Sequence, residues 1–373
     1  MTVPNRWAVL LRQNYTKILA SIVIGVAFWL VLRRGGLPIM PDDFGSVKWW
    51  TLPAYAATVA IWSTLRAART RHLLRPVAPI PLTQILSVSW IGFLAIFVLP
   101  FRIGEVIRPA LFKNKNQVSF ATAAGACGAE RIIDGLVLMT LLGVSLPLGG
   151  LLDPLPDHIG ELPIPLVAVP AAAYFTLLLF VAAAIAMSVF FWRRQWARRT
   201  IDRLVGTVSK RLAAYLSDQV EKLSEGFRFL PSPRHIAPYM LETILYWTVA
   251  AAGMWMLAWG CGVSDITLTR SFALLGVLGL GIIVPGAPGY FGAFQGAIYA
   301  GLALYFPEDI VLSNGATFVF CLYAAQMSVM FIMAATSVFI GHGSRHTIHI
   351  PKLDNQYPDQ LATDQPMHDH SSS

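Results

Sequence analysis

The sequence has few charged side chains and few cysteines for its length. Hydrophobic residues make up 55% of the 373 residues and charged residues only 13%, which is too little polar surface to coat a soluble globule. Three cysteines, Cys127, Cys261 and Cys321, stand far apart in apolar stretches. Their spacing excludes a disulfide framework and a cysteine-based metal site, so we interpret them as packing residues. Composition therefore predicts a polytopic membrane protein.

Motifs of the soluble function classes are also missing. The net charge of +8 does not indicate nucleic acid as a partner, because the basic residues stand between apolar runs rather than in a patch with stacking aromatics. The connections contain no Asp-rich motif, HExxH or glycine-rich phosphate loop, so we predict no enzymatic activity and no cofactor. Five histidines near the C-terminus lack acidic or thiol partners at suitable spacing, and no metal site is predicted. These are His342, His346, His349, His368 and His370.

Nine apolar segments predict an all-α polytopic membrane protein. With the N-terminus in the cytoplasm, the cytoplasmic connections receive 21 of the 28 lysines and arginines, in agreement with the positive-inside tendency. The same orientation places the C-terminus in the cytoplasm. We therefore predict a multi-pass protein of the cell inner (plasma) membrane. The approximate segments are 16–33, 49–65, 81–101, 118–148, 165–192, 236–261, 270–285, 289–306 and 311–341.

Two stretches of this layout begin and end on the same side of the membrane. The basic connections 66–75 and 113–115 are both assigned to the cytoplasm, so residues 81–112 enter the membrane and return as a re-entrant hairpin. Residues 268–306 form a second hairpin from the opposite face, with PGAPG at its tip. The layout predicts about six spanning helices plus two opposed re-entrant helical hairpins. A bundle of ordinary helices with hinges at the prolines remains the alternative.

Each hairpin lies in a three-element unit, and the two units have opposite orientations. Such an inverted repeat is typical of transporters. The linker between the units has apolar residues at helical spacing among many basic ones, which predicts a basic amphipathic helix on the anionic cytoplasmic leaflet, with a partner-binding helix as the alternative. The predicted parts are an N-terminal helix and periplasmic loop (1–48), the first unit (49–148), a spanning helix and cytoplasmic amphipathic linker (149–235), the second unit (236–341) and a disordered cytoplasmic tail (342–373).

Charged residues cluster in the first hairpin and at the start of the segment that follows it. A charge at the centre of a bilayer costs about 2.5 to 3.5 kcal/mol on insertion scales, so six unpaired charges would oppose insertion. One interpretation is that they form structural ion pairs between the hairpin and the 118–148 helix. The other is that some arginines face a cavity and bind an anionic headgroup, because the planar guanidinium binds two phosphate oxygens and keeps its proton. The six residues are Arg102, Glu105 and Arg108, then Glu130, Arg131 and Asp134.

The order of these motifs resembles a known family. The motif RIGExxR from Arg102, then ERxxD from Glu130, and later PGAPGYFGAFQ at residues 285–295, resemble the lysylphosphatidylglycerol synthase transmembrane, or flippase-like, family. That family includes the flippase domain of the bacterial multiple peptide resistance factor. The resemblance implies an inner-membrane protein that moves or handles lipids, with two opposed re-entrant elements. Where many members carry PGGxGxxE, this chain has Tyr290 at the second glycine and Gln295 at the acid, which weakens any mechanism that needs a titrating carboxylate there.

The second hairpin is rich in glycine and aromatic residues instead of charge. Gly292 and Gly296, with the adjacent alanines, give a small surface that favours close helix approach. One interpretation is glycine packing alone. The other is a pliable, aromatic-rich lining for acyl or polyprenyl chains, with Gln295 hydrogen-bonded to a headgroup.

These patterns together predict a lipid flippase or translocator for an anionic-headgroup lipid, such as a phospholipid or a polyprenyl phosphate. Its expected partners are the membrane and a membrane lipid substrate. The alternative is a non-catalytic membrane helper that presents lipid to a lipid-biosynthetic enzyme. The predicted substrate-binding residues are Arg102, Glu105, Arg108, Glu130, Arg131, Asp134, Pro288, Gly289, Gly292 and Gln295.

Overall fold

Apolar runs separated by proline and glycine fold into helices, some long enough to span a membrane and others shorter. Four stretches are long and apolar enough to cross a membrane, which makes the chain an all-α, multi-pass membrane protein, as predicted. They are α6 (Phe120–Leu148), α7 (Ala168–Trp192), α10 (Pro233–Gly260) and Glu308–Ser337, which comprises α13 (Glu308–Leu312) and most of α14 (Asn314–Gly343). The computed structural model describes residues 19, 23–41, 43–99, 104–116, 118–205, 207, 209–283 and 287–343.

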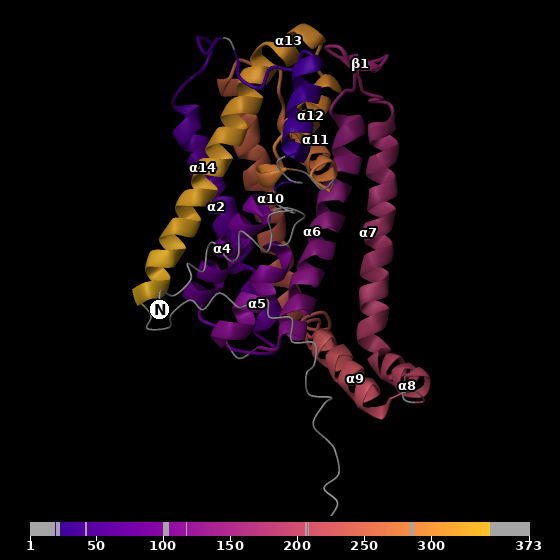
Figure 1. Ribbon diagram of the computed structural model, residues 1–373. Coiled ribbons are helices and arrows are strands. Elements are labelled where there is room, and N and C mark those ends of the chain that lie inside the picture. The colour runs from indigo at the N-terminus through magenta and orange to yellow at the C-terminus, as the bar shows by residue number, and fades with distance from the viewer. Residues whose placement is uncertain are drawn as a thin grey trace, which may run out of the picture.

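The long helices run along the length of the molecule. α13 and the short antiparallel pair β1 (His158–Ile159) and β2 (Leu162–Pro163) lie at one end, and α8 (Arg194–Leu204) and α9 (Lys210–Glu225) lie at the other (Figure 1). α2 (Thr51–Ala68) packs beside α10, where glycines permit close approach. A Cβ on Gly253 or Gly260 of α10 would stand 2.2 Å from a threonine hydroxyl of α2. The predicted 49–65 segment is therefore a helix of this central bundle.

α4 (Leu82–Val98) and α5 (Gly104–Asn116) form the first of two helix pairs. α4 ends where Leu99 becomes extended, with ψ 137°, because the following proline disfavours helical geometry at the residue before it. α5 then runs antiparallel to α4: a Cβ on Gly104 would lie 2.2 Å from the Ala95 carbonyl carbon, and one on Gly92 would lie 2.9 Å from the Arg108 Cβ. The absence of a side chain at Gly104 thus lets the returning helix touch the backbone of the first.

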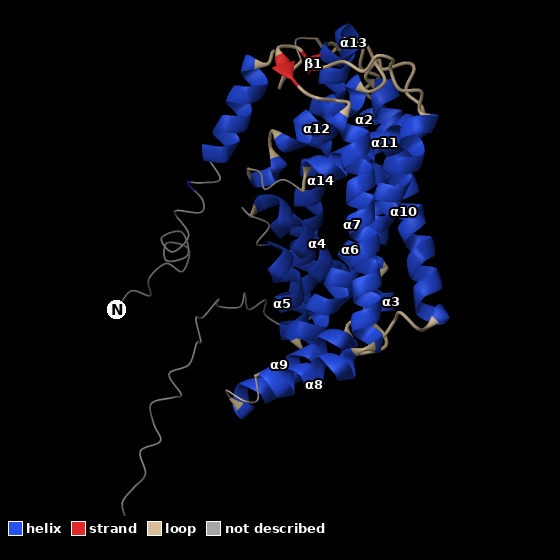
Figure 2. Ribbon diagram, turned by 90° about the vertical axis from the view of Figure 1, so that its right-hand side faces the viewer, coloured by secondary structure: helices blue, strands red, loops and turns tan. Residues whose placement is uncertain are grey.

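α11 (Leu268–Gly281) and α12 (Ala293–Ala303) form the second antiparallel pair, with the short 3-10 turn η2 (Pro288–Tyr290) before α12. A Cβ on Gly281 would meet the Ala297 Cβ at 2.4 Å, and one on Gly301 would lie 3.3 Å from Leu274. The helix of residues 23–34 stands beside this pair, at the edge of the bundle in Figure 2. The second pair is therefore held by small side chains.

The linker folds differently from the single amphipathic helix that the sequence predicted. It forms two helices, α8 and α9, because Ser209 starts a new helix by accepting a hydrogen bond from Leu212 N at 3.3 Å. The two helices pack together through an ion pair between Arg198 and Glu221 at 2.7 Å. They form a separate arm at the end of α7.

Two apolar clusters form the core, and polar side chains lie between them. On α6, Ile133 belongs to one cluster and Leu138 to the other. Along the segment that ends α2, Ala67 belongs to the larger cluster and Leu73 to the smaller. The buried residues between these positions are polar and include the charged Arg69 and Asp134, so an electrostatic layer divides the apolar core.

Candidate functional site

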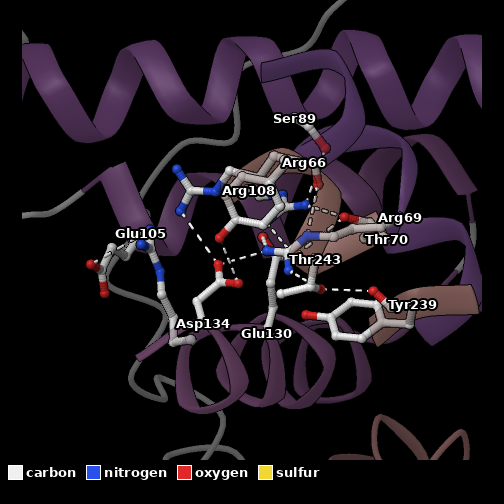
Figure 3. A network of polar contacts seen from close by, with 12 residues as sticks. Arg66, Arg69, Thr70, Ser89, Glu105, Arg108, Glu130, Asp134, Tyr239 and Thr243 are labelled. Atoms are coloured by element: carbon white, nitrogen blue, oxygen red, sulfur yellow. Dashed lines mark hydrogen bonds and ion pairs between the residues drawn. The ribbon is translucent and has the colours of Figure 1, made fainter. Parts of the chain in front are cut away.

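Two acids on α6 are the centre of the polar layer. Glu130 and Asp134 are four residues apart, so they share one face of the helix, and both are buried. Arg108 of α5 reaches this face: its Nη1 donates to Glu130 Oε2 at 2.8 Å (Figure 3). Arg108 Nη2 also donates to the hydroxyls of Thr70 at 2.6 Å and Ser89 at 3.2 Å. The structure therefore brings together the charges of the first hairpin and of α6.

Arg69, between α2 and α3 (Thr70–Leu74), completes the layer and is fully buried. Its Nη2 donates to Asp134 Oδ2 at 2.6 Å and to Glu130 Oε1 at 3.4 Å, and its Nη1 donates to Thr243 Oγ1 at 2.7 Å. Its guanidinium also lies over the Tyr246 ring, 4.6 Å from the centroid. Arg69 thereby ties α2, α6 and α10 into one network.

The predicted end of the second apolar segment at residue 65 was too early. α2 continues to Ala68, so Arg66 and Arg69 belong to the charged layer and not to an open connection between helices. The count of charges gave no sign that these two arginines were missing, because the six predicted residues already contained three arginines and three acids. A signal was available in their spacing: three residues apart, they fall on one side of a helix opposite two acids.

The inner layer holds more positive than negative charge. Among its described members, three arginines face two carboxylates, and Arg66 is the least satisfied, with its Nη2 3.8 Å from Asp134 Oδ2. The Phe93 ring lies against both Arg66 and Arg108, at 4.7 and 5.1 Å from their guanidinium carbons. Several buried groups make no hydrogen bond within the described chain, although such groups normally do. These include Ser63 Oγ, Arg66 Nε, Trp90 Nε1, Arg108 Nε and Tyr239 Oη.

The outer edge of the layer is more open. Arg131 Nη2 lies 3.8 Å from Glu105 Oε1, and each of these side chains is 37% exposed. Glu105 stands in the first turn of α5, at the other side of the cluster from Tyr239 in Figure 3. Arg102, the remaining predicted charge, lies outside the described residues. The five described charges of the predicted six therefore divide into a buried ion-paired part, Arg108, Glu130 and Asp134, and an exposed edge, Glu105 and Arg131.

The predicted residues of the second hairpin form a turn with its own cap. Gly289 and Gly292 have φ of +73° and +87°, backbone conformations that favour glycine. Gln295 is buried, and its Oε1 accepts a hydrogen bond from Gly292 N at 2.7 Å. Pro288 starts the η2 turn, and Tyr323 Oη donates to the Gly289 carbonyl at 3.1 Å. The Gln295 carbonyl is thus engaged in holding the start of α12.

The aromatic residues of this hairpin are largely packed inside the protein. Tyr290, Phe294 and Tyr299 are all buried. The Tyr290 ring meets Phe97 of α4 edge to face, with centroids 5.4 Å apart. Because Phe97 lies one residue before the end of α4, this contact joins the breaks of the two helix pairs. The charged layer and the Pro288–Gln295 turn belong to connected but different parts of the molecule.

Spanning-length helices around a buried charged layer define a polytopic, all-α membrane protein. Residues 17–339 match the family described as the lysylphosphatidylglycerol synthase TM region, and the chain belongs to this family. The match includes every described residue of the charged layer and of the second hairpin turn. Neither a curated protein nor a solved structure matches the chain.

Proposed function

We propose that this protein is a lipid translocator of the bacterial inner membrane that binds lipids with anionic headgroups. Family membership supports a role connected with membrane lipid. The helix pairs support re-entry, since α4 has 17 residues and α11 has 14, fewer than the roughly 20 that cross a bilayer, and each helix is followed by an antiparallel partner. In this proposal the pairs enter from opposite faces within an inverted repeat of about six spans, and both termini are cytoplasmic.

The observation that carries the proposal is the unbalanced charge of the inner layer. Three arginines against two carboxylates leave one positive charge, and burial of an uncompensated charge is costly. The unsatisfied groups include the guanidinium Nε–H groups of Arg66 and Arg108, which lie against Phe93, and the indole N–H of Trp90, three residues before Phe93 on α4, and all of them are donors. An anionic group with several acceptor oxygens, such as a phosphate, matches both properties.

The buried and exposed charges take different parts in this function. Arg69, Arg108, Glu130 and Asp134 hold four helix segments together, so they form the inner wall of the site. Arg66, with a 19% exposed side chain, and the Glu105–Arg131 pair stand where a headgroup would first meet the layer. Arg131 would exchange Glu105 for the headgroup, which is a small change because exposed ion pairs are weak.

No covalent step is part of this proposal, so the protein is not proposed to be an enzyme. Binding and release of the headgroup require only that the ligand competes with internal carboxylates. The hairpin breaks, joined by the Phe97–Tyr290 contact, would move as the headgroup passes. Pro288, Gly289 and Gly292 would supply the turn of the second hairpin, and Gln295 its cap.

A transport assay tests the proposal. The full-length protein is reconstituted in liposomes with fluorescent phosphatidylglycerol, phosphatidylcholine or a polyprenyl phosphate, and movement between leaflets is followed by quenching of accessible label. We expect faster movement of the anionic lipids, and a loss of about tenfold in Arg66→Gln, because a charge-assisted hydrogen bond contributes roughly 1.5 kcal/mol or more. Arg75→Gln is the matched control, since Arg75 is an exposed arginine beyond α3.

The outcomes separate the proposal from its alternative. Movement that is unchanged in Arg66→Gln and Arg131→Gln would remove the charged layer from the headgroup site. If no lipid moves but anionic lipid co-purifies with the protein, the helper that presents lipid to a biosynthetic enzyme is the better description.

A further inference from the structure

The arm formed by α8 and α9 starts directly at the end of a lipid-exposed helix. The side chains of Phe175, Leu178 and Ile185 on α7 are 59% to 63% exposed, as expected of a helix that faces acyl chains. Its last residue, Trp192, is 70% exposed, and Arg193 alone separates it from α8. Since tryptophan at the end of a spanning helix marks the membrane–water interface, α8 begins at the membrane surface.

The exposed side chains of the arm combine aromatic and basic groups. Trp196 is 66% exposed, and Arg199 and Arg203 follow it at three and seven residues, on the same side of α8. Leu212 and Tyr215 continue the exposed apolar surface on α9. Residues 193–211 contain seven basic residues and one acid. This composition complements a layer of anionic headgroups above acyl chains.

Three of the four acids of α8 and α9 are already engaged by partners within the arm. Glu221 pairs with Arg198 at 2.7 Å, and Asp202 accepts a hydrogen bond from Ser217 at 2.9 Å. Asp218 likewise pairs with Lys222. In contrast, the structure gives no ion pair for Arg193, Arg199 or Arg203, which are exposed parts of the described chain. The outward charge of α8 is therefore strongly positive. Among the described residues, the basic side chains of the arm that have no ion pair with another described residue are those of Arg193, Arg194, Arg199, Arg203, Lys210 and Arg211.

The arm is also fixed firmly to α6. A Cβ on Gly226 would stand 2.5 Å from the Thr122 carbonyl oxygen, and one on Gly125 would stand 2.4 Å from the Leu223 carbonyl oxygen. Thr122 Oγ1 donates to Glu225 Oε2 at 3.1 Å. These contacts hold α9 against the start of the helix that carries Glu130 and Asp134. These contacts fix the orientation of α9 relative to α6.

We propose that α8 and the start of α9 bind anionic phospholipid headgroups of the membrane surface beside α7. The tryptophans lie at the level of the headgroups, and the arginines contact their phosphates. This surface is separate from the buried charged layer, so the inference does not depend on transport. Each basic residue near an anionic surface strengthens binding about fivefold, and several act together here.

Hydrogen–deuterium exchange of the full-length protein in nanodiscs tests this inference. The discs contain either phosphatidylcholine alone or equal parts of phosphatidylcholine and phosphatidylglycerol. We expect the α8 amides to exchange about tenfold more slowly in the anionic discs. The variant R193Q/R199Q/R203Q should lose this difference. Unchanged exchange over α6 and α10 would show that the variant keeps its fold.

The variant R33Q/R34Q/K48Q is the control, because it removes the same charge from the end of the helix of residues 23–34 and from the residue three before α2, both away from the arm. It should keep the slow exchange of α8 in anionic discs. Equal exchange of α8 in the two kinds of disc overturns the proposal and leaves a protein partner as the alternative occupant of this surface. Loss of the difference in the control variant also overturns it, since total charge and not the arm would then be responsible.

Discussion

The α4–α5 pair is fixed to its neighbours by charge, whereas the α11–α12 pair is fixed by close packing of small residues. Arg108 of α5 bonds to α6 and to two hydroxyls at 2.6 to 3.2 Å. In the second pair, Gly281 and Gly292 allow contacts that a methyl group would prevent. An anionic ligand can replace the carboxylate that an arginine is paired with, but no ligand can replace a contact between two closely packed helices. The charged pair is therefore suited to respond to a headgroup, and the packed pair to keep its shape.

The strongest test of this contrast is Glu130→Ala in the charged layer. It leaves the buried guanidinium groups of Arg69 and Arg108 without their shared carboxylate, which we expect to cost about 3 to 5 kcal/mol of unfolding free energy. Chemical unfolding of the purified protein in detergent measures the change. A loss below about 1 kcal/mol would show that the layer does not hold the first hairpin.

In the packed hairpin, Gly292→Ala should have the next largest effect. The added Cβ would lie 2.2 Å from the Phe28 Cβ, and the φ of +87° strains any side chain, so we expect a loss of about 1 to 3 kcal/mol. Gly296→Ala is the matched control, because a Cβ there meets nothing within 4 Å and alanine favours the helix. Equal thermal unfolding temperatures for the two variants would contradict the assigned role of close packing.

The cap of α12 makes a smaller contribution that Gln295→Ala should reveal. The substitution leaves Gly292 N without its acceptor, which we expect to cost about 1 kcal/mol of unfolding free energy. Amide exchange should increase at the first turn of α12 and stay unchanged in α5. A uniform increase over both hairpins would mean that the cap holds more than its own turn.

The least effect on stability is expected at the exposed edge of the charged layer. Arg131→Gln breaks the 3.8 Å contact with Glu105, and exposed pairs contribute about 0 to 1 kcal/mol. Unfolding should therefore change little, while movement of anionic lipid in liposomes slows. A stability loss as large as that of Glu130→Ala would place Arg131 with the structural residues.

The sequence predicted the helices better than it predicted which residues contact one another between helices. Hydropathy indicated the helices of spanning length. The end of α4 at Leu99 has a local cause, because proline disfavours helical geometry at the residue before it. Ion pairs between the first hairpin and the 118–148 helix were one of two interpretations of the charges, and the structure contains such a pair between Arg108 and Glu130. The positions of Arg66 and Arg69 were not predicted, because hydropathy ends the apolar segment at residue 65, and the spacing of the two arginines becomes a signal only if the helix continues to Ala68.

The second hairpin turn shows a different limit. Glycine spacing predicted close approach at both Gly292 and Gly296, which is wrong for Gly296, where an added Cβ would meet nothing within 4 Å of the described chain. The spacing also did not identify Phe28, which is far away in sequence, as the residue that covers Gly292. Gln295 was predicted to bind a headgroup because it is a polar amide side chain in an apolar segment. In the structure its side-chain carbonyl completes a cap within the same turn, a role that only the local backbone geometry reveals, and contact with a headgroup stays a prediction.

The complete burial of Arg69 has a practical consequence. Dissolved ions screen exposed charges over a distance of about 10 Å at 0.1 M salt but act much less on buried pairs. Raising the ionic strength should therefore loosen the arm from a charged bilayer while the Arg69–Asp134 contact stays intact. Salt concentration then becomes a reversible control that separates what happens at the surface of this protein from what happens in its interior.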